Sequence, residues 1–594
     1  MNLIERIEAL RGTMAQKQID AYIITGTDPH LSEYIPDYWK TREWISGFSG
    51  SYGRVVITSN QAALWTDSRY FLQAEEQLKG SEMIMMKDRQ PDTISFDNWI
   101  IGQLRKGAIT AVDGLTISAR EFQSLQQKLD ANGITLVQSD DLLYPIWKDR
   151  TAIPDAVAYS HEMKYAAISR EEKFELIRSK LHQLGASATI ITLLDDIAWS
   201  FNLRGCDIQY NPFVTAYGYI SLSQAILFVD MVKIPNSLKD ILVKENIILK
   251  QYGEFQSFLS QIKDQNILID FDRTTINIYN QLSDSNQLID EVSIPTKLKW
   301  VNSKEQIMGM KKAHIRDRAA MVNFLHWFGQ NFGKMVMTEM TVVDKLFEFR
   351  SQQQLFAGIS FHPIVGFGAH GAIVHYSVSK ASDIAVEKDG ILLIDSGGHY
   401  LDGTTDITRT ISTGNVTLQQ KRDFTIVLKG MIGLANAVFP EGTKGYSLDS
   451  FARKSLWDNG INYGHGTGHG IGHFLSVHEG PMSIRQEYNP EPILEGQILS
   501  NEPAMYRTGQ YGIRTENVIL CEKRMSTEYG NFLGFETITL CPVDQKLVLP
   551  ELLSAEERIW LNNYHQQVVN ELSPLLDEPV KKWLSMQWVP LPIV

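Results

Sequence analysis

The chain has 594 residues, of which 43% are hydrophobic and 21% are charged, the proportions of an ordinary water-soluble protein of about three or four domains. Its formal net charge of −13 at pH 7 argues against nucleic acid or an anionic membrane as a partner, because both attract basic surfaces. The three cysteines are far apart in sequence, which predicts neither a disulfide framework nor a thiolate metal site and favours a reducing compartment.

The first part of the chain starts with a short amphipathic segment and then alternates strand-like and helix-like patterns. Residues 1–11 lack the apolar core of a signal peptide, and we find no apolar run of the ~20 residues that a membrane span requires. We therefore expect a cytoplasmic protein without a membrane span. Strand-like residues 21–25 and 54–58 are followed by helix-like residues 70–78 and 118–129, which predicts an α/β domain over 1–153.

The pattern then starts again, as an internal repeat would. Ile-Ile-Thr at 23–25 recurs at 190–192, and Gln-Ala-Ala-Leu-Trp-Thr-Asp at 61–67 recurs as Gln-Ala-Ile-Leu-Phe-Val-Asp at 224–230. A chance match between strands of the same type is the alternative. The shared order of several segments favours a second domain, 154–302, related to the first.

The next region begins with a helix signal. Ser-Lys-Glu-Gln at 303–306 is a capping box in front of a helical pattern that runs from 307 to about 332. The residues of chemical interest follow, up to about 540, and the tail has a helical pattern. We predict a catalytic domain over 303–540 and a helical extension over 541–594.

The stretch 391–410 predicts two paired strands that carry carboxylates. Residues 391–394 are apolar and are followed by Asp395, turn residues come next, and the strand-like residues 404–411 contain Asp406. If the strands pair, the two carboxylates converge. Two buried carboxylates repel each other unless a proton or a cation lies between them. An exposed hairpin with solvated aspartates is the alternative.

Histidines lie between glycines in one later segment. Residues 463–473 read Tyr-Gly-His-Gly-Thr-Gly-His-Gly-Ile-Gly-His, which contains His465, His469 and His473, and His478 follows closely. Backbone without Cβ atoms lets imidazoles approach a ligand, whereas a plain glycine-rich turn would not explain the histidines. The segment lacks the lysine of a phosphate-binding loop.

Two further strand-like segments carry acids. Residues 496–503 are apolar and contain Glu502 just before a proline, and residues 511–520 form a continuous strand pattern with Arg514 and Glu516 on one face. A charged pair in a mainly apolar strand needs a partner or a metal ion to offset its desolvation. A structural salt bridge is the alternative for this strand.

These acids and one histidine form a candidate metal centre. Four carboxylates and one imidazole suit a hard divalent cation, most of all Mn²⁺, with Co²⁺, Fe²⁺ or Zn²⁺ as alternatives. The anionic charge favours two ions rather than one. The candidate ligands are Asp395, Asp406, His469, Glu502 and Glu516.

The order and contexts of these ligands resemble the pita-bread metallopeptidases. The matching motifs are Ile394-Asp395-Ser396-Gly397, Thr405-Asp406-Ile407-Thr408-Arg409-Thr410, His465-Gly466-Thr467-Gly468-His469-Gly470, Asn501-Glu502-Pro503 and Arg514-Thr515-Glu516-Asn517. Segments at 67–74, 310–317 and 560–565 extend the resemblance over essentially the whole chain, to the three-domain, cytosolic type of Xaa-Pro aminopeptidase. The resemblance implies an α/β (α+β) fold with two creatinase-like N-terminal domains before a pita-bread catalytic domain.

The resemblance also implies which residues hold the metal ions. One ion would be bound by Asp395, Asp406 and Glu516, and the other by Asp406, His469, Glu502 and Glu516. Asp406 and Glu516 would then bridge the two ions. A hydroxide held between them is a nucleophile at neutral pH, with Glu502 as its general base. Arg514 would orient a ligand carboxylate, that of Asp395.

Residues that contact the substrate are implied in the same way. His375, His465 and His478 would bind the scissile carbonyl or donate to the leaving nitrogen, with His375 and His478 in catalytic roles. His469 and Glu502 would also line the substrate site, and Arg69 of the first domain would contribute to substrate binding. His473 stands where family members often have a small residue, and its role stays open.

The implied function is a metal-dependent aminopeptidase, a homodimer that acts on peptides with proline at the second position. Prolidase, which is restricted to dipeptides, is the alternative within the fold, and the additional domains and tail argue against it. A metal-free creatinase-type hydrolase would not retain all five ligands. A non-catalytic pita-bread protein that binds other proteins would also be expected to have lost some of them.

Overall fold

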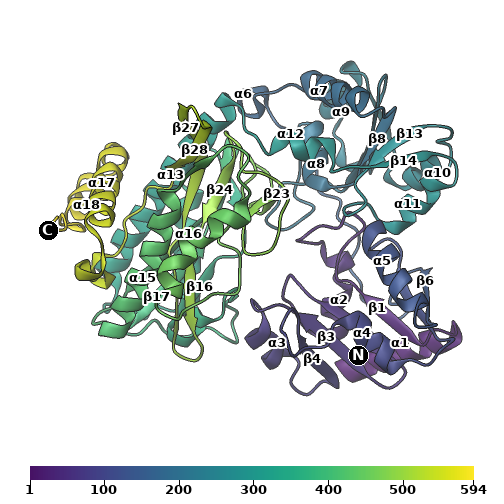
Figure 1. Ribbon diagram of the computed structural model, residues 1–594, viewed down its shortest axis with the longest axis horizontal. Helices are drawn as coiled ribbons and strands as arrows, with labels where there is room; N and C mark the ends of the chain where they lie inside the picture. The colour runs from purple at the N-terminus through teal and green to yellow at the C-terminus, as the bar shows by residue number, and fades with distance from the viewer. Residues whose placement is uncertain (594) are drawn as a thin grey trace. The chain divides into compact units, whose positions relative to one another are not determined.

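The computed structural model describes residues 1–593 and divides into two compact units. The first contains residues 1–162 and 168–297, and the second contains residues 163–167 and the chain from Leu298 onward. In Figure 1 the first unit runs from purple to teal and the second continues through green to yellow. No helix among the described residues has both the length and the apolar composition of a membrane-spanning segment.

The first unit begins with a six-stranded mixed sheet in the order β4-β3-β2-β1-β5-β6. Strand β1 is antiparallel to β2 and parallel to β5, and all four of its residues are buried. The strands are β1 (Ala21–Ile24), β2 (Arg54–Thr58), β3 (Ala62–Thr66), β4 (Met83–Lys87), β5 (Ile109–Asp113) and β6 (Thr135–Ser139). The helices are α1 (Leu3–Gln16), α2 (Thr41–Ser46), α3 (Phe71–Gln77), α4 (Phe96–Gln103) and α5 (Ala119–Asp130).

A second sheet in the same unit repeats this topology, in the order β12-β11-β10-β8-β13-β14. Its first strand in sequence, β8, is antiparallel to β10 and parallel to β13, as β1 is to its neighbours. The similar segments 61–67 and 224–230 correspond to β3 and β11, which hold the same position in the two sheets. The strands are β8 (Ala188–Ile191), β10 (Ala216–Ser221), β11 (Ala225–Val229), β12 (Ile247–Lys250), β13 (Asn266–Ile269) and β14 (Gln287–Asp290), and the helices are α7 (Arg170–Gln183), α8 (Leu194–Ser200), α9 (Asn236–Lys244), α10 (Phe255–Leu259) and α11 (Ile276–Ser283).

The second unit starts with the long helix α13 (Lys304–Asn331), as the capping box predicted. Ser303 accepts a hydrogen bond from the Gln306 backbone, and the Gln306 side chain bonds back to Ser303. The predicted helical tail is confirmed as α17 and α18, which pack with α15 around one apolar core. Figure 1 shows α15 and α16 side by side. The other helices are α14 (Glu339–Ser351), α15 (Leu418–Ala435), α16 (Gly445–Trp457), α17 (Ala555–Leu572) and α18 (Glu578–Met586).

Several small sheets and one six-stranded sheet carry the acids of the second unit. The orders are β16-β17-β20, β15-β18-β19, β25-β26 and β21-β28-β27-β24-β22-β23. The strands are β15 (Phe356–Ile359), β16 (Ile364–Phe367), β17 (Ile391–Ser396), β18 (Gly398–Tyr400), β19 (Gly403–Thr404), β20 (Ile407–Ser412), β21 (Val438–Pro440), β22 (Gly468–Gly470), β23 (Glu479–Ile484), β24 (Ile498–Asn501), β25 (Ala504–Arg507), β26 (Tyr511–Arg514), β27 (Asn517–Thr527) and β28 (Gly530–Thr537).

The continuous strand predicted over 511–520 is wrong. The chain forms β26, leaves it at Thr515 and Glu516, and starts β27 at Asn517 in another sheet. The Thr515 N–H donates to the Pro503 carbonyl at 3.3 Å and the Glu516 N–H to the Thr408 carbonyl at 3.1 Å. These partners belong to other segments, so alternation within 511–520 could not show that the chain changes sheets.

Candidate metal centre

The two strands around the first acid pair are antiparallel neighbours, as predicted. In the β17–β20 pair, Asp395 lies opposite Thr408, and Asp406 directly precedes β20. Both aspartates are buried, and every residue of β17 is buried. The exposed-hairpin alternative is therefore excluded. Burial of an apolar strand that contains a carboxylate places negative charge where water does not solvate it.

The other candidate ligands meet this pair. Single ligand atoms of Asp406, His469 and Glu516 all lie within 4.8 Å of one another. His469 Nε2 is 3.6 Å from an Asp406 carboxylate oxygen and 3.5 Å from Glu502 Oε1. The charges of Asp395, Glu502 and Glu516 all act on Asp406. The structure therefore brings the five predicted ligands into one cluster.

The cluster has the properties of a cation site. One oxygen each of Asp395, Asp406 and Glu516 is buried and has no hydrogen-bond partner among the described residues. Burial raises the pKa of Asp406 and of Glu516 well above their ordinary values, and the neighbouring carboxylates raise both further. A divalent cation would satisfy the free oxygens and compensate the repulsion, so these residues fit a metal centre.

Hydrogen bonds orient two of the ligands. His469 Nδ1 is 3.0 Å from the Gly470 carbonyl oxygen. A carbonyl only accepts, so Nδ1 carries the proton, and in the neutral ring the lone pair of Nε2 is then available to a cation held between it and the carboxylates. The Thr408 hydroxyl donates to Glu516 Oε2 at 2.8 Å, which leaves Oε1 as the oxygen without a partner.

Arg514 connects the centre to His465 through Tyr506, which the sequence analysis did not single out. Arg514 donates to an Asp395 oxygen at 2.6 Å and to the Tyr506 hydroxyl at 2.6 Å. That hydroxyl is 2.8 Å from His465 Nε2, and His465 Nδ1 is 2.7 Å from the Gly466 carbonyl oxygen. In the neutral ring Nδ1 therefore donates and Nε2 accepts from Tyr506. A tyrosine four residues after Glu502 was the available sequence signal, but nothing local shows its partners.

Tyr506→Phe should lower kcat/KM about 10- to 100-fold with unchanged metal content, because it removes the link between Arg514 and His465 and leaves the ring in place. Steady-state kinetics and metal analysis of the purified protein test this. Tyr511→Phe, in the paired strand, is the control, since that hydroxyl donates to Asp423. Equal effects of the two substitutions would contradict the prediction.

The remaining predicted residues lie in different places. The His478 and His469 rings contact edge to face with centroids 4.5 Å apart. His375 follows a short 3-10 turn, Gly368–Ala372, that packs against β17 and β26. Arg69 belongs to the first unit and forms an ion pair with Asp67 at 2.7 Å. His473 is buried beside Gly309 of α13.

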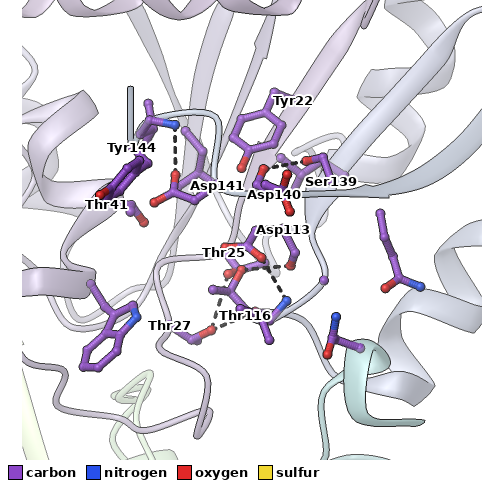
Figure 2. Close-up of a pocket in the computed structure, with 18 of the residues that line it drawn as sticks. Tyr22, Thr25, Thr27, Thr41, Asp113, Thr116, Ser139, Asp140, Asp141 and Tyr144 are labelled. Atoms are coloured by element: carbon purple, nitrogen blue, oxygen red, sulfur yellow. Dashed lines mark hydrogen bonds between the residues drawn. The ribbon is translucent and has the colours of Figure 1, made fainter. Parts of the chain in front are cut away.

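A hollow of about 890 Å³ lies in the first unit, where β1, β5 and β6 end (Figure 2). Asp113, Asp140 and Asp141 line it, together with Tyr22. Asp113 accepts from the Leu115 N–H at 2.9 Å, and burial raises its pKa to about 7. None of the predicted site residues lines this hollow, so we assign the metal chemistry to the cluster in the second unit.

Family models match the chain in four consecutive segments. Creatinase/Prolidase N-terminal domains match residues 6–146 and 149–306, metallopeptidase family M24 matches 308–523, and the C-terminal region of peptidase_M24 matches 531–591. These matches confirm the expected architecture of two creatinase-like domains before a pita-bread domain.

Full-length relatives agree with these matches. The chain is 37% identical to "Probable Xaa-Pro aminopeptidase P" of Laccaria bicolor, over 100% of this chain and 94% of the relative, and 38% identical to "Aminopeptidase P2" of Arabidopsis thaliana, over 99% and 88%. The crystal structure of an X-prolyl aminopeptidase from Caenorhabditis elegans, described as a cytosolic enzyme with a di-nuclear active site, superposes with a TM-score of 0.95 at 32% identity, over 99% of this chain and 100% of that one. The chain therefore belongs to the Xaa-Pro aminopeptidase P group of metallopeptidase family M24.

Proposed function

We propose that the chain is a dinuclear-metal Xaa-Pro aminopeptidase that hydrolyses the bond between an N-terminal residue and a following proline. The observation that carries the proposal is the five-ligand cluster with its three buried carboxylate oxygens that lack a partner among the described residues. Relatives named for this activity match the chain over its full length.

The donor set supports two divalent cations, with Mn²⁺ preferred because four carboxylates and one imidazole are mostly hard ligands. Asp406 and Glu516 would be shared between the ions. Each of them interacts electrostatically with both Asp395 and Glu502, which we assign to different ions. Asp395 would complete one site, and His469 and Glu502 the other. When bound, such ions lower the pKa of a water molecule towards neutrality and polarise a carbonyl oxygen.

Glu502 would act as the general base. Its side chain is 18% exposed, so water reaches it, whereas Asp406 and Glu516 are almost fully buried. Glu502 Oε1 accepts from the Ser500 hydroxyl at 3.3 Å and faces His469 Nε2. A carboxylate that is held in place and still solvated can take a proton from the attacking water.

Three histidines would assist the substrate. The leaving nitrogen belongs to proline and must gain a proton. His375 or His478 would donate that proton. Both ring nitrogens of His465 already bond protein groups, so direct contact with a peptide would displace Tyr506. Arg69 would bind the peptide from the first domain.

We also propose a homodimer, which size-exclusion chromatography with light scattering tests.

The protein loaded with Mn²⁺ should release arginine from Arg-Pro-Pro and should lose this activity after chelation. Chromatographic detection of free arginine and Pro-Pro measures the reaction. An intact Arg-Pro-Pro peptide would refute the proposal. The dipeptide Arg-Pro separates the alternatives, because a prolidase would cleave Arg-Pro and leave the tripeptide intact.

A further inference from the structure

A buried carboxylate outside the metal centre holds the segment that carries His375. Glu339 is the first residue of α14 and is 0% exposed. Its Oε1 accepts from the Phe367 N–H at 2.8 Å, and its Oε2 accepts from the Tyr376 hydroxyl at 2.8 Å. His370 Nδ1 lies 3.0 Å from Oε1 and 2.9 Å from Oε2. One side chain therefore binds three residues of a single loop.

In sequence, two of these three residues precede His375 and the third follows it directly. Phe367 ends β16, His370 lies in the following turn, and Tyr376 is the residue directly after His375. Between the last two, the Ile373 N–H donates to the His370 carbonyl and the Tyr376 N–H to the Ile373 carbonyl, both at 3.0 Å. The path from His370 to Tyr376 is thus two consecutive turns with both ends attached to Glu339.

The opposite side of this loop contacts strand β26, which carries Arg514. A Cβ atom on Gly512 of β26 would lie 1.7 Å from the Gly371 carbonyl oxygen, so the two backbones are in direct contact. Strand β26 ends in Arg514, which donates to Asp395. The loop is therefore packed between Glu339 and the strand that orients a metal ligand, and a shift of the loop would move His375 relative to that ligand.

From this geometry we infer that Glu339 is a positioning residue that fixes the segment carrying His375 against the strand that orients Asp395. The inference rests on the proposed role of His375 in Xaa-Pro hydrolysis. The hydrogen bonds that Glu339 accepts come from Phe367, His370 and Tyr376, and none of these residues is a candidate ligand, so its effect on the reaction passes through the loop.

Glu339→Gln, His375→Ala and the double variant test the inference. Glutamine keeps the shape but replaces one acceptor oxygen by an N–H donor, which then faces donors of the loop. We expect Glu339→Gln to lower kcat about 10- to 100-fold with unchanged KM and metal content. In the His375→Ala background it should cost less than about threefold, because the residue it positions is already missing. Equal losses in both backgrounds, or wild-type kcat in the single variant, would overturn the inference.

Hydrogen exchange of residues 367–376 supplies a readout that does not depend on activity. Faster exchange there in Glu339→Gln, with metal content unchanged, is expected, and unchanged exchange overturns the anchoring. This measurement also decides the matter if the wild-type chain leaves Xaa-Pro peptides intact, a result that refutes the proposed function alone.

Two further variants control for the loss of a buried carboxylate and for misfolding. Asp207→Asn removes a buried carboxylate that accepts from Lys233, Thr215 and Ala156 in the first unit, and it should leave kcat unchanged. If Glu339→Gln does not fold, Tyr376→Phe removes one of its three donors and should lower kcat in the same direction by less. Wild-type kcat in Tyr376→Phe would then overturn the inference.

Discussion

Asp406→Asn is expected to abolish activity and, in the same protein, to stabilise the metal-free form. Asp406 Oδ1 has no partner among the described residues, and Glu516, Asp395 and Glu502 all repel the Asp406 charge. If Asp406 is the shared metal ligand that we propose, an amide there should lower kcat/KM on the order of a thousandfold, the equivalent of several kcal/mol of lost metal-ion stabilisation. Without metal, the same change removes the repulsion and gives the neighbouring carboxylates an N–H donor.

The pH dependence of the metal-free protein has a definite sign. Burial and the neighbouring carboxylates raise the folded-state pKa of Asp406 above the unfolded value of about 3.9. The folded protein then holds a proton that the unfolded chain loses, so the contribution of Asp406 to stability is highest below about pH 4 and falls as pH rises towards the folded pKa. The slope should be smaller in Asp406→Asn.

Thermal unfolding with a chelator present measures the stability of the metal-free form. Metal analysis measures the loss of the ligand, and Arg-Pro-Pro kinetics measure the loss of activity. Asp402→Asn is the matched control, because Asp402 is a buried aspartate in the same hairpin region that pairs with Arg316 rather than with the cluster. It should retain bound metal and activity. Full activity in Asp406→Asn would contradict the assignment of a shared ligand.

Asp317→Asn should destabilise the second unit by about 3–5 kcal/mol, the range for breaking a buried ion pair from one side. Asp317 is fully buried between Arg318 at 2.5 Å and Arg350 at 2.8 Å, and it accepts from the Tyr400 hydroxyl at 3.0 Å. Its removal leaves two buried guanidinium groups without a carboxylate.

The same arginines support the strands of the metal centre. Arg318 donates to the Asp406 carbonyl at 3.2 Å, and Arg350 donates to the Ser396 carbonyl at 3.4 Å. These carbonyls stand at the start of β20 and the end of β17, where the first two ligands are. We therefore expect metal affinity to fall together with stability in Asp317→Asn.

Acid weakens this contribution. Although burial raises the pKa of Asp317, Arg350 and Arg318 lower it to about 2. The stabilisation is thus complete above the unfolded pKa of about 3.9 and is lost as pH falls through about 2. Denaturant midpoints at neutral pH and near pH 3 should show a smaller gap between wild type and variant at the lower pH.

Asp423→Asn is the comparison for this effect. Asp423 is also buried, but its partner Arg507 is 33% exposed and can be hydrated when the carboxylate is lost. The loss of stability should therefore be clearly smaller than for Asp317→Asn. Similar losses would mean that burial of the carboxylate, and not the two stranded arginines, sets the cost.

Local patterns were sufficient to predict much of the fold and to select the candidate ligands. Ser303 and Gln306 start α13 because a capping box satisfies backbone donors within four residues. Asp395 belongs to the buried strand β17 and Asp406 lies directly before β20, two strands whose apolar, β-branched character is visible in the sequence. The order of the five ligands, each in its own short motif, carried the family resemblance.

The remaining hydrogen bonds and ion pairs of the site join segments that are far apart in sequence. Hydrophobic periodicity within a segment does not predict such contacts. Tyr506 joins Arg514 and His465 only because β25 pairs with β26, and Glu516 leaves the predicted strand to bond Thr408. The Asp317 network and the Glu339 anchor depend on side chains from separate helices and loops that meet where water is excluded. A polar group buried there must find a partner at any sequence distance, so the folded chain alone determines which partner that is.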